Sequence, residues 1–311
     1  MSPLRAPRGD GEVGPFLQAL GLPGLADVHV HFHPDRLMER IWAYFDEGER
    51  HYGMAWPIHY RTSAEERLRT LGELGVHAVP ALTYAHRPGM AEALNAWCRD
   101  FADDHPQVLR CATLYPEAGV TEYVREAVRD GVQLVKVHVT VSDMAPDDER
   151  LGEAWELLAR ACVPVVIHAG HGPRQGRFSG PERVARLLAD HPDLTLVVAH
   201  MGMPDYDAFA DLAEGHERVH LDTTMVGTDF MERVAPVPRA FLGRLADLRH
   251  KVVLGSDFPN IPYPYAHQLE ALHRWGLGEE WLRDVLWHNG RRLLGLDAHA
   301  PAASTPAPVR D

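Results

Sequence analysis

Five side chains that could hold a metal stand where short apolar runs of the sequence end. His29 and His31 close the first run, His168 and His200 close two later ones, and Asp257 follows the last. His29 and His31 are two residues apart, so in an extended strand both imidazoles project from the same face. Imidazoles combined with a carboxylate suit Zn²⁺, and also Fe²⁺, Co²⁺ or Mn²⁺, whereas Ca²⁺ and Mg²⁺ prefer oxygen ligands. These residues therefore predict one divalent transition metal, with Zn²⁺ favoured.

Eight short, β-branched apolar runs are the elements that must position these groups. They span residues 24–32, 75–83, 108–115, 132–139, 163–169, 194–200, 218–224 and 251–257. Segments with helical periodicity lie between them, among them 63–75, 89–105, 120–131, 152–163, 181–191 and 204–215. Strands and helices alternating in this way over roughly 250 residues predict a single α/β domain folded as a (β/α)8, or TIM, barrel. An open doubly wound sheet is the structural alternative.

The barrel prediction also places the chemistry. Active sites of (β/α)8 barrels form at the C-terminal ends of the strands, which is where the histidines and Asp257 fall. We expect their side chains to meet in the barrel mouth, while Val28, Val30 and Phe32 pack outward against helices.

The sequence further predicts where the domain begins and ends. We expect the barrel to span residues 14–297. The connection 33–62 is long and rich in aromatic residues, which predicts a lid-like insertion after strand one. Residues 1–13 and the Ala/Pro/Ser-rich tail 298–311 have little to bury, so we expect both segments to be disordered.

Five ordered motifs carry a resemblance to a known family. They are Asp-x-His-x-His at 27–31, Val-Lys-Val-His at 135–138, Ile-His-Ala-Gly at 167–170, Ala-His-Met-Gly at 199–202 and Gly-Ser-Asp-Phe-Pro at 255–259. Over residues 24–296 the chain resembles the amidohydrolase superfamily. It is most similar to the amidohydrolase-2 branch, the metal-dependent hydrolases that include aminocarboxymuconate-semialdehyde decarboxylase. Gly290 stands where the closing helix of that branch usually has alanine.

The resemblance implies a role for each motif residue. His29, His31 and His168 would be metal ligands, and Asp257 would be both a ligand and a base for metal-activated water. His200 would be an acid/base group next to the ligands. The chemistry agrees, because a divalent metal brings the pKa of water near 7 and an imidazole can move protons in the same range.

Four further residues stay open between two interpretations. Lys136 would be a carbamylated bridge between two metals in binuclear members of the superfamily, or else an ion-pair partner of a barrel carboxylate such as Asp27. His138, on the same strand end, either touches substrate or supports the groups that do. Arg174 and Arg177, in the loop after strand five, either grip a substrate carboxylate or are ordinary exposed charges.

The functional expectation is hydrolysis of an amide, ester or lactone of a small organic substrate by metal-activated water. The alternative is non-oxidative decarboxylation of an unsaturated or aromatic carboxylic acid at the same site. A more remote alternative is a non-catalytic barrel that binds a metal or ligand. An open barrel mouth beside a spare acid/base argues against that last interpretation, because structural zinc sites are normally closed by four ligands.

Composition excludes other classes of partner. The net charge of −13 argues against nucleic acid and anionic membranes, and no apolar stretch is long enough for a membrane span. The three cysteines are not spaced for a metal or redox site, which favours a cytoplasmic enzyme. A homodimer is compatible with the sequence, which does not set the oligomeric state.

Overall fold

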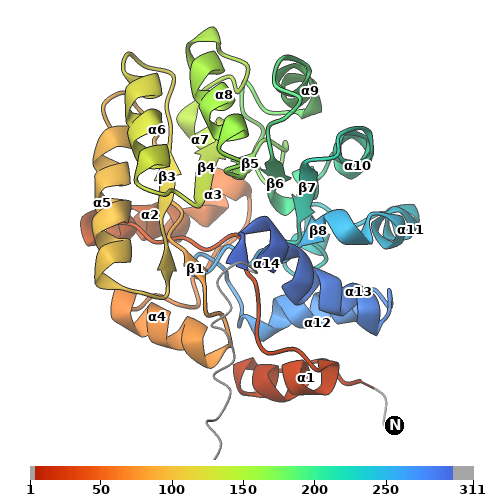
Figure 1. Cartoon of the computed structure of the whole chain (residues 1–311). Coiled ribbons are helices and arrows are strands. Elements are labelled where there is room, and N and C mark those ends of the chain that lie inside the picture. Colours follow the sequence, from red (N-terminus) through yellow and green to blue (C-terminus); the bar gives the residue numbers. More distant parts are fainter. Residues whose placement is uncertain (1–3, 297–311) are drawn as a thin grey trace, which may run out of the picture.

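The computed structural model describes residues 4–296 and shows a ring of parallel strands surrounded by helices (Figure 1). The strands are β1 (Val79–Pro80), β2 (Val108–Leu109), β3 (Cys111–Thr113), β4 (Leu134–His138), β5 (Val165–His168), β6 (Leu196–Val198), β7 (Val219–Asp222) and β8 (Val252–Val253). β1 pairs with β2, and β3 to β8 form a parallel sheet in sequence order. The predicted run 108–115 is thus split into two short strands at Arg110.

Residues 24–32 close the ring without forming a regular strand. Isolated bridges join Leu25 to Val76 and His31 to Leu82 on one side, and Val30 to Phe258 on the other. All eight predicted runs therefore take part in one closed barrel, which confirms the predicted fold class.

Helices of varied length connect the strands and cover the outside of the barrel (Figure 1). They are α1 (Val13–Leu20), α2 (Asp35–Asp46), α3 (Gly48–Tyr52), α4 (Ala64–Glu73), α5 (Ala91–Asp104), α6 (Val120–Arg129), α7 (Val139–Ser142), α8 (Gly152–Arg160), α9 (Pro181–Asp190), α10 (Tyr206–Gly215), α11 (Arg239–Asp247), α12 (Ala266–Arg274), α13 (Glu279–Arg283) and α14 (Asn289–Leu293). A π-helical turn, Asp284–His288, joins the last two, and 3₁₀ turns span Asp10–Glu12, Glu149–Leu151, Ala199–Gly202, Met231–Arg233 and Arg249–Lys251.

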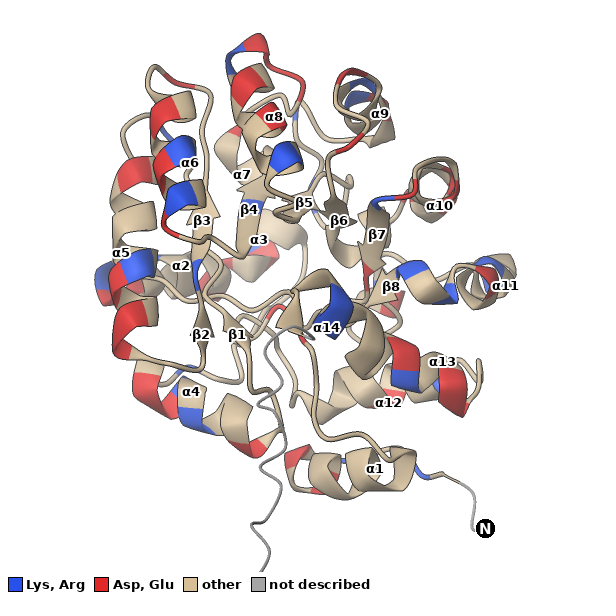
Figure 2. Cartoon of the chain, viewed as in Figure 1, with Lys and Arg blue, Asp and Glu red and all other residues tan. Residues whose placement is uncertain are grey.

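Local signals in the sequence account for several helix starts. The Ser63 side chain accepts a hydrogen bond from the Glu66 amide and caps α4. Pro181 opens α9, where its missing N–H costs nothing. The charged residues belong mainly to these outer helices, whereas the strands have few of them (Figure 2). Among residues 4–296 no helix is both long and apolar enough to cross a membrane.

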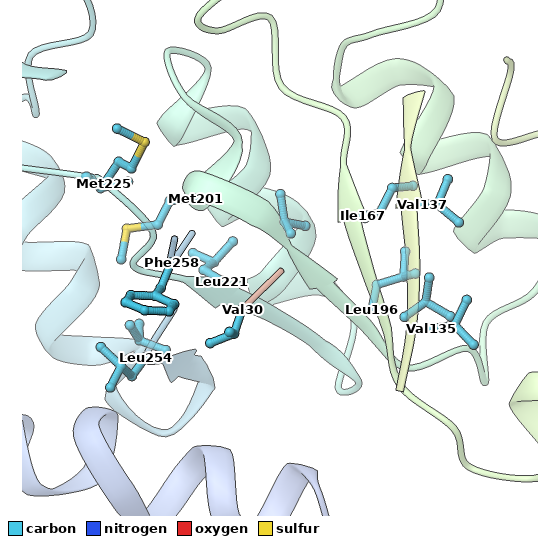
Figure 3. Packing of buried hydrophobic residues seen from close by; sticks show 14 of the residues in the cluster. Val30, Val135, Val137, Ile167, Leu196, Met201, Leu221, Met225, Leu254 and Phe258 are labelled. Atoms are coloured by element: carbon cyan, nitrogen blue, oxygen red, sulfur yellow. The ribbon is translucent and has the colours of Figure 1, made fainter. Parts of the chain in front are cut away.

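Two apolar layers hold the barrel together. The outer layer lies between strands and helices and includes Val135 and Val137 of β4 and Ile167 of β5, which lie close to one another in Figure 3. The inner layer includes Leu134, Val166, Val197 and Val253. Since side chains alternate along a strand, the same spacing that buries Val135 and Val137 outside turns Lys136 and His138 toward the barrel mouth.

Two expectations need correction. Val28 belongs to the inner layer, not the outer one, because the Asp27 carboxylate accepts the His29 amide and this local turn shifts the alternation by one residue. Residues 10–13 are ordered, because the Asp10 carboxylate accepts hydrogen bonds from the Tyr60 hydroxyl and the Ala266 amide. Residues 1–3 and the tail 298–311 lie outside the described residues.

Candidate metal centre

Three electron-pair donors meet at the C-terminal mouth of the barrel. The Nε2 atoms of His29 and His31 lie 3.2 Å apart. Asp257 Oδ1 lies 2.9 Å from His31 Nε2 and 3.5 Å from His29 Nε2. Among the described residues, this is the group of three or more His, Cys, Asp or Glu side chains whose ligand atoms converge within 4.8 Å.

Hydrogen bonds on the far side of each ring fix which nitrogen carries the hydrogen. His29 Nδ1 lies 2.8 Å from the Asp222 carboxylate, and His31 Nδ1 lies 3.1 Å from the carbonyl oxygen of Leu82. Both partners only accept hydrogen bonds, so Nδ1 is the donor and the lone pair of each neutral ring is on Nε2. Two lone pairs and a carboxylate that face one another can share a cation. The site therefore fits a divalent metal held by nitrogen and oxygen donors.

His168 and His200 share the same cavity but make different contacts. The His168 ring stacks on His138 with centroids 4.0 Å apart, and its Nε2 lies 3.0 Å from the Gly172 carbonyl. It is therefore not among the three converging donors, and its role as a ligand stays a prediction. His200 Nδ1 lies 3.1 Å from the Thr224 carbonyl, and the His200 ring centroid lies 5.4 Å from that of His29.

Comparison with known proteins decides the family. A family model described as amidohydrolase matches residues 26–296. The chain belongs to the amidohydrolase family. This makes it an enzyme of the amidohydrolase type rather than a non-catalytic barrel. No curated protein matches the sequence.

Solved structures similar to this amidohydrolase share its barrel at low sequence identity. An uncharacterised TIM-barrel protein from Bordetella bronchiseptica has a TM-score of 0.68 and 18% identity, with 87% of this chain and 99% of that chain covered. The 5-carboxyvanillate decarboxylase from Sphingomonas paucimobilis has a TM-score of 0.60 and 15% identity, with 88% and 99% covered. A probable 2-pyrone-4,6-dicarboxylic acid hydrolase from Acinetobacter baumannii has a TM-score of 0.55 and 14% identity, with 86% and 98% covered. At these identities the likeness bears on the fold.

Burial controls the charge state of the amidohydrolase's site. It lowers the pKa of His29 to about 3, and the nearby Lys136 ammonium acts in the same direction. Burial also lowers the pKa of His200. For Asp257 burial acts to raise the pKa, but the close contact with His31 and the imidazoles of His29 and His200 outweigh it and hold the pKa well below its usual range. Neutral imidazoles and an ionised carboxylate are the forms that bind metals.

Lys136 contacts the His29 imidazole rather than a carboxylate. Its Nζ lies 2.9 Å from His29 Nε2, so the expected ion pair with Asp27 is not the one that forms. Asp27 instead accepts hydrogen bonds from the His29 amide and the Tyr265 hydroxyl. The Lys136 ammonium donates to the same lone pair that a metal would use. Burial lowers the pKa of Lys136 to about 8.

A cavity of about 800 Å³ opens above the donors. Its walls include aromatic side chains of the 33–62 segment, so this segment forms part of the pocket wall, and its role as a lid stays a prediction. Arg174 and Arg177 line the cavity, together with Arg40 and Arg87, which sequence patterns did not single out. Arg174 Nη1 donates to the Tyr44 hydroxyl at 3.2 Å. None of the four guanidiniums has an ion pair among the described residues.

Sequence patterns also missed Asp222, the buried carboxylate behind His29. It lies in the predicted strand RVHLDTT (218–224), where it was counted as an ordinary strand residue. A run that ends in Asp-Thr-Thr instead of apolar residues was the available signal, because an isolated acid inside a buried strand needs partners.

Proposed function

We propose that this amidohydrolase is a metal-dependent hydrolase that cleaves an amide, ester or lactone bond in a small organic acid. The observation that carries the proposal is the set of three donors, His29 Nε2, His31 Nε2 and Asp257 Oδ1, that face one another at the floor of a large cavity. We further propose Zn²⁺ as the metal and His168 as an additional ligand. A Zn²⁺ ion bound here would supply a Lewis acid that activates water at neutral pH.

The residues around the donors supply the proton transfers. Asp257 accepts a proton from the attacking water, since its carboxylate is ionised and lies beside both histidines. His200 keeps Nδ1 on the Thr224 carbonyl, which leaves Nε2 for the cavity. We propose that His200 passes the proton to the leaving atom, and that His138 orients substrate from the neighbouring strand end.

The arginines around the cavity favour a substrate that carries a carboxylate. Arg174 and Arg177 lie in the loop after β5, and Arg40 and Arg87 lie on other segments of the same cavity wall. Four guanidiniums without carboxylate partners in a chain of net charge −13 form a local positive field that attracts anions. Guanidinium groups also bind carboxylates through paired hydrogen bonds.

The same arginines support decarboxylation as a second candidate function. A carboxylate held over the metal would lose CO₂, and His200 would relay a proton from solvent to the carbon left behind. Both candidates use the same site and differ in the product.

A substrate panel separates the two functions. The metal-loaded enzyme would be incubated with carboxylated lactones, aryl esters and N-acyl amino acids, and in parallel with aromatic and unsaturated carboxylic acids. Acid release without CO₂ is the expected result. Release of CO₂ from the second set alone would replace hydrolysis by decarboxylation, and no turnover of either set by metal-loaded protein would contradict both.

Lys136 gives a direct readout of how many metals the site takes. The chain has two lysines, Lys136 in the site and Lys251 in the 3₁₀ turn before β8, so a protein labelled with ¹³C at the lysine ε-carbon gives two side-chain NMR signals. We expect one equivalent of Zn²⁺ to shift the Lys136 signal, because the metal displaces the ammonium from His29 Nε2, and to leave the Lys251 signal unchanged. A carbamate carbonyl signal after addition of ¹³C-bicarbonate would instead support the bridged two-metal site.

The choice of zinc, a cytoplasmic location and a homodimer stay predictions. The three cysteines are free thiols, and Cys98 and Cys111 are buried, which agrees with a reducing compartment.

A further inference from the structure

The buried carboxylate of Asp222 contacts two functional parts of the site at once. Asp222 ends β7 and its side chain has no solvent exposure. Its Oδ2 lies 2.8 Å from His29 Nδ1. Its Oδ1 accepts the backbone amides of His200 at 2.7 Å and Thr224 at 3.0 Å. One carboxylate therefore joins a proposed metal ligand to the proposed acid/base residue.

The Oδ2 contact selects the tautomer of His29 that can bind a metal. A carboxylate cannot donate, so Nδ1 carries the hydrogen and the Nε2 lone pair faces the cavity. The Lys136 ammonium, 2.9 Å from Nε2, independently requires a lone pair on that nitrogen. Partners of this kind behind metal-binding histidines typically raise metal affinity about 10- to 100-fold.

The Asp222 Oδ1 contacts hold the His200 backbone in the left-handed conformation, which is unfavourable for residues other than glycine. His200 has φ 55° and ψ 28°, and Met201 follows with φ 51°. Left-handed residues other than glycine persist only when their surroundings hold them. Gly202 follows with φ 72°, and only glycine fits there, because a Cβ at that position would lie 2.0 Å from the Phe209 ring. The Asp222 carboxylate supplies the acceptor for the His200 amide.

We propose that Asp222 is the positioning residue of this site: it keeps His29 in its metal-binding tautomer and places His200 relative to the metal. The proposal rests on the proposed metal site and deepens it.

Asp222→Asn separates the two contacts because an amide has one accepting and one donating end. If the amide oxygen keeps the backbone amides of His200 and Thr224, the NH₂ group faces His29 Nδ1 and moves the ring hydrogen to Nε2, which removes the metal-binding lone pair. If the asparagine side chain is flipped instead, its NH₂ group faces the backbone N–H groups of His200 and Thr224. These two buried donors then lose their acceptor. Either orientation weakens metal binding.

The test is a titration of metal-free protein with Co²⁺, followed by the visible absorption of the bound ion. We expect Asp222→Asn to raise the Kd for Co²⁺ by about 10- to 100-fold while far-UV circular dichroism stays that of the wild type. Asp27→Asn is the matched control: Asp27 is equally buried, but it accepts the His29 backbone amide rather than the ring. The Kd of Asp27→Asn for Co²⁺ is expected to stay within about threefold of the wild-type value, since this substitution does not change the His29 tautomer.

Thr224→Val tests the other group near the same nitrogen, because the Thr224 hydroxyl lies 3.0 Å from His29 Nδ1. If Asp222→Asn does not fold, Asp222→Ser takes its place, since serine keeps an acceptor oxygen but is too short to reach the ring. An unchanged Kd in the Asp222 variant, or an equal loss in Asp27→Asn or Thr224→Val, would overturn the proposal. A wild type that binds no Co²⁺ would instead reject the metal site itself.

Discussion

Asp257→Asn is expected to lower kcat/KM by about 10³-fold or more, because it removes a proposed metal ligand and the proposed proton acceptor together. Asparagine has nearly the same shape and tolerates the left-handed backbone of Asp257, whose φ is 68°. The substitution thus changes charge and basicity with little change in fold. The measurement is steady-state kinetics on the substrate found in the panel, combined with metal content per chain.

Asp205→Asn provides the matched control for this prediction. Asp205 pairs with His171 at 2.7 Å, and neither residue lines the cavity. The control should turn over substrate like the wild type, since it alters an aspartate–histidine pair outside the site. A loss of less than about tenfold in Asp257→Asn would be incompatible with a base that contributes the usual 10²- to 10⁴-fold.

His200→Asn is expected to reduce turnover by about 10²- to 10⁴-fold without loss of metal. The His200 ring is held on the Thr224 carbonyl and is not one of the three converging donors. Asparagine suits the left-handed backbone at this position and keeps the amide that Asp222 accepts. The variant therefore removes the acid/base group and leaves the ligands in place.

Metal analysis gives this prediction its sharpest test. Wild-type metal content combined with low turnover would separate His200 from the ligands. If the variant lost its metal, His200 would have to be counted as a ligand, and turnover near that of the wild type would exclude it from proton transfer.

The fold was predictable because each barrel strand is buried on both faces. Such strands appear as continuous apolar runs, and β4 to β8 lie inside the predicted ranges. The polar residues that end those runs, such as His31 and Asp257, stood out for the same reason, since an apolar strand that stops at an ionisable group marks the point where the core meets the cavity.

The contacts between distant strands were not predictable from the pattern. Asp222 and His29 are 193 residues apart, and only the closed barrel brings them to 2.8 Å. Lys136 was expected to bridge two metals or to pair with a carboxylate such as Asp27, and its contact with His29 depends on side-chain packing at the mouth. The shift at Val28 came from a local hydrogen bond of Asp27, which strand periodicity does not contain.

The order of residues 10–13 has a similar cause. The segment is polar and lacks a hydrophobic face of its own, which is why disorder was expected. Its Asp10 carboxylate is bound by groups from residues 60 and 266, so long-range hydrogen bonds rather than local preference order it.

Metal content measured by elemental analysis tests the central claim most directly. The wild type and His29→Ala would be purified without a histidine tag, reconstituted with Zn²⁺ and freed of excess ion. One zinc per wild-type chain, lost in a His29→Ala variant that keeps its circular dichroism spectrum, is the result predicted by a site of His29, His31 and Asp257. A wild type that holds no metal after reconstitution with Zn²⁺, Mn²⁺ or Co²⁺, or a variant that holds as much as the wild type, would contradict it.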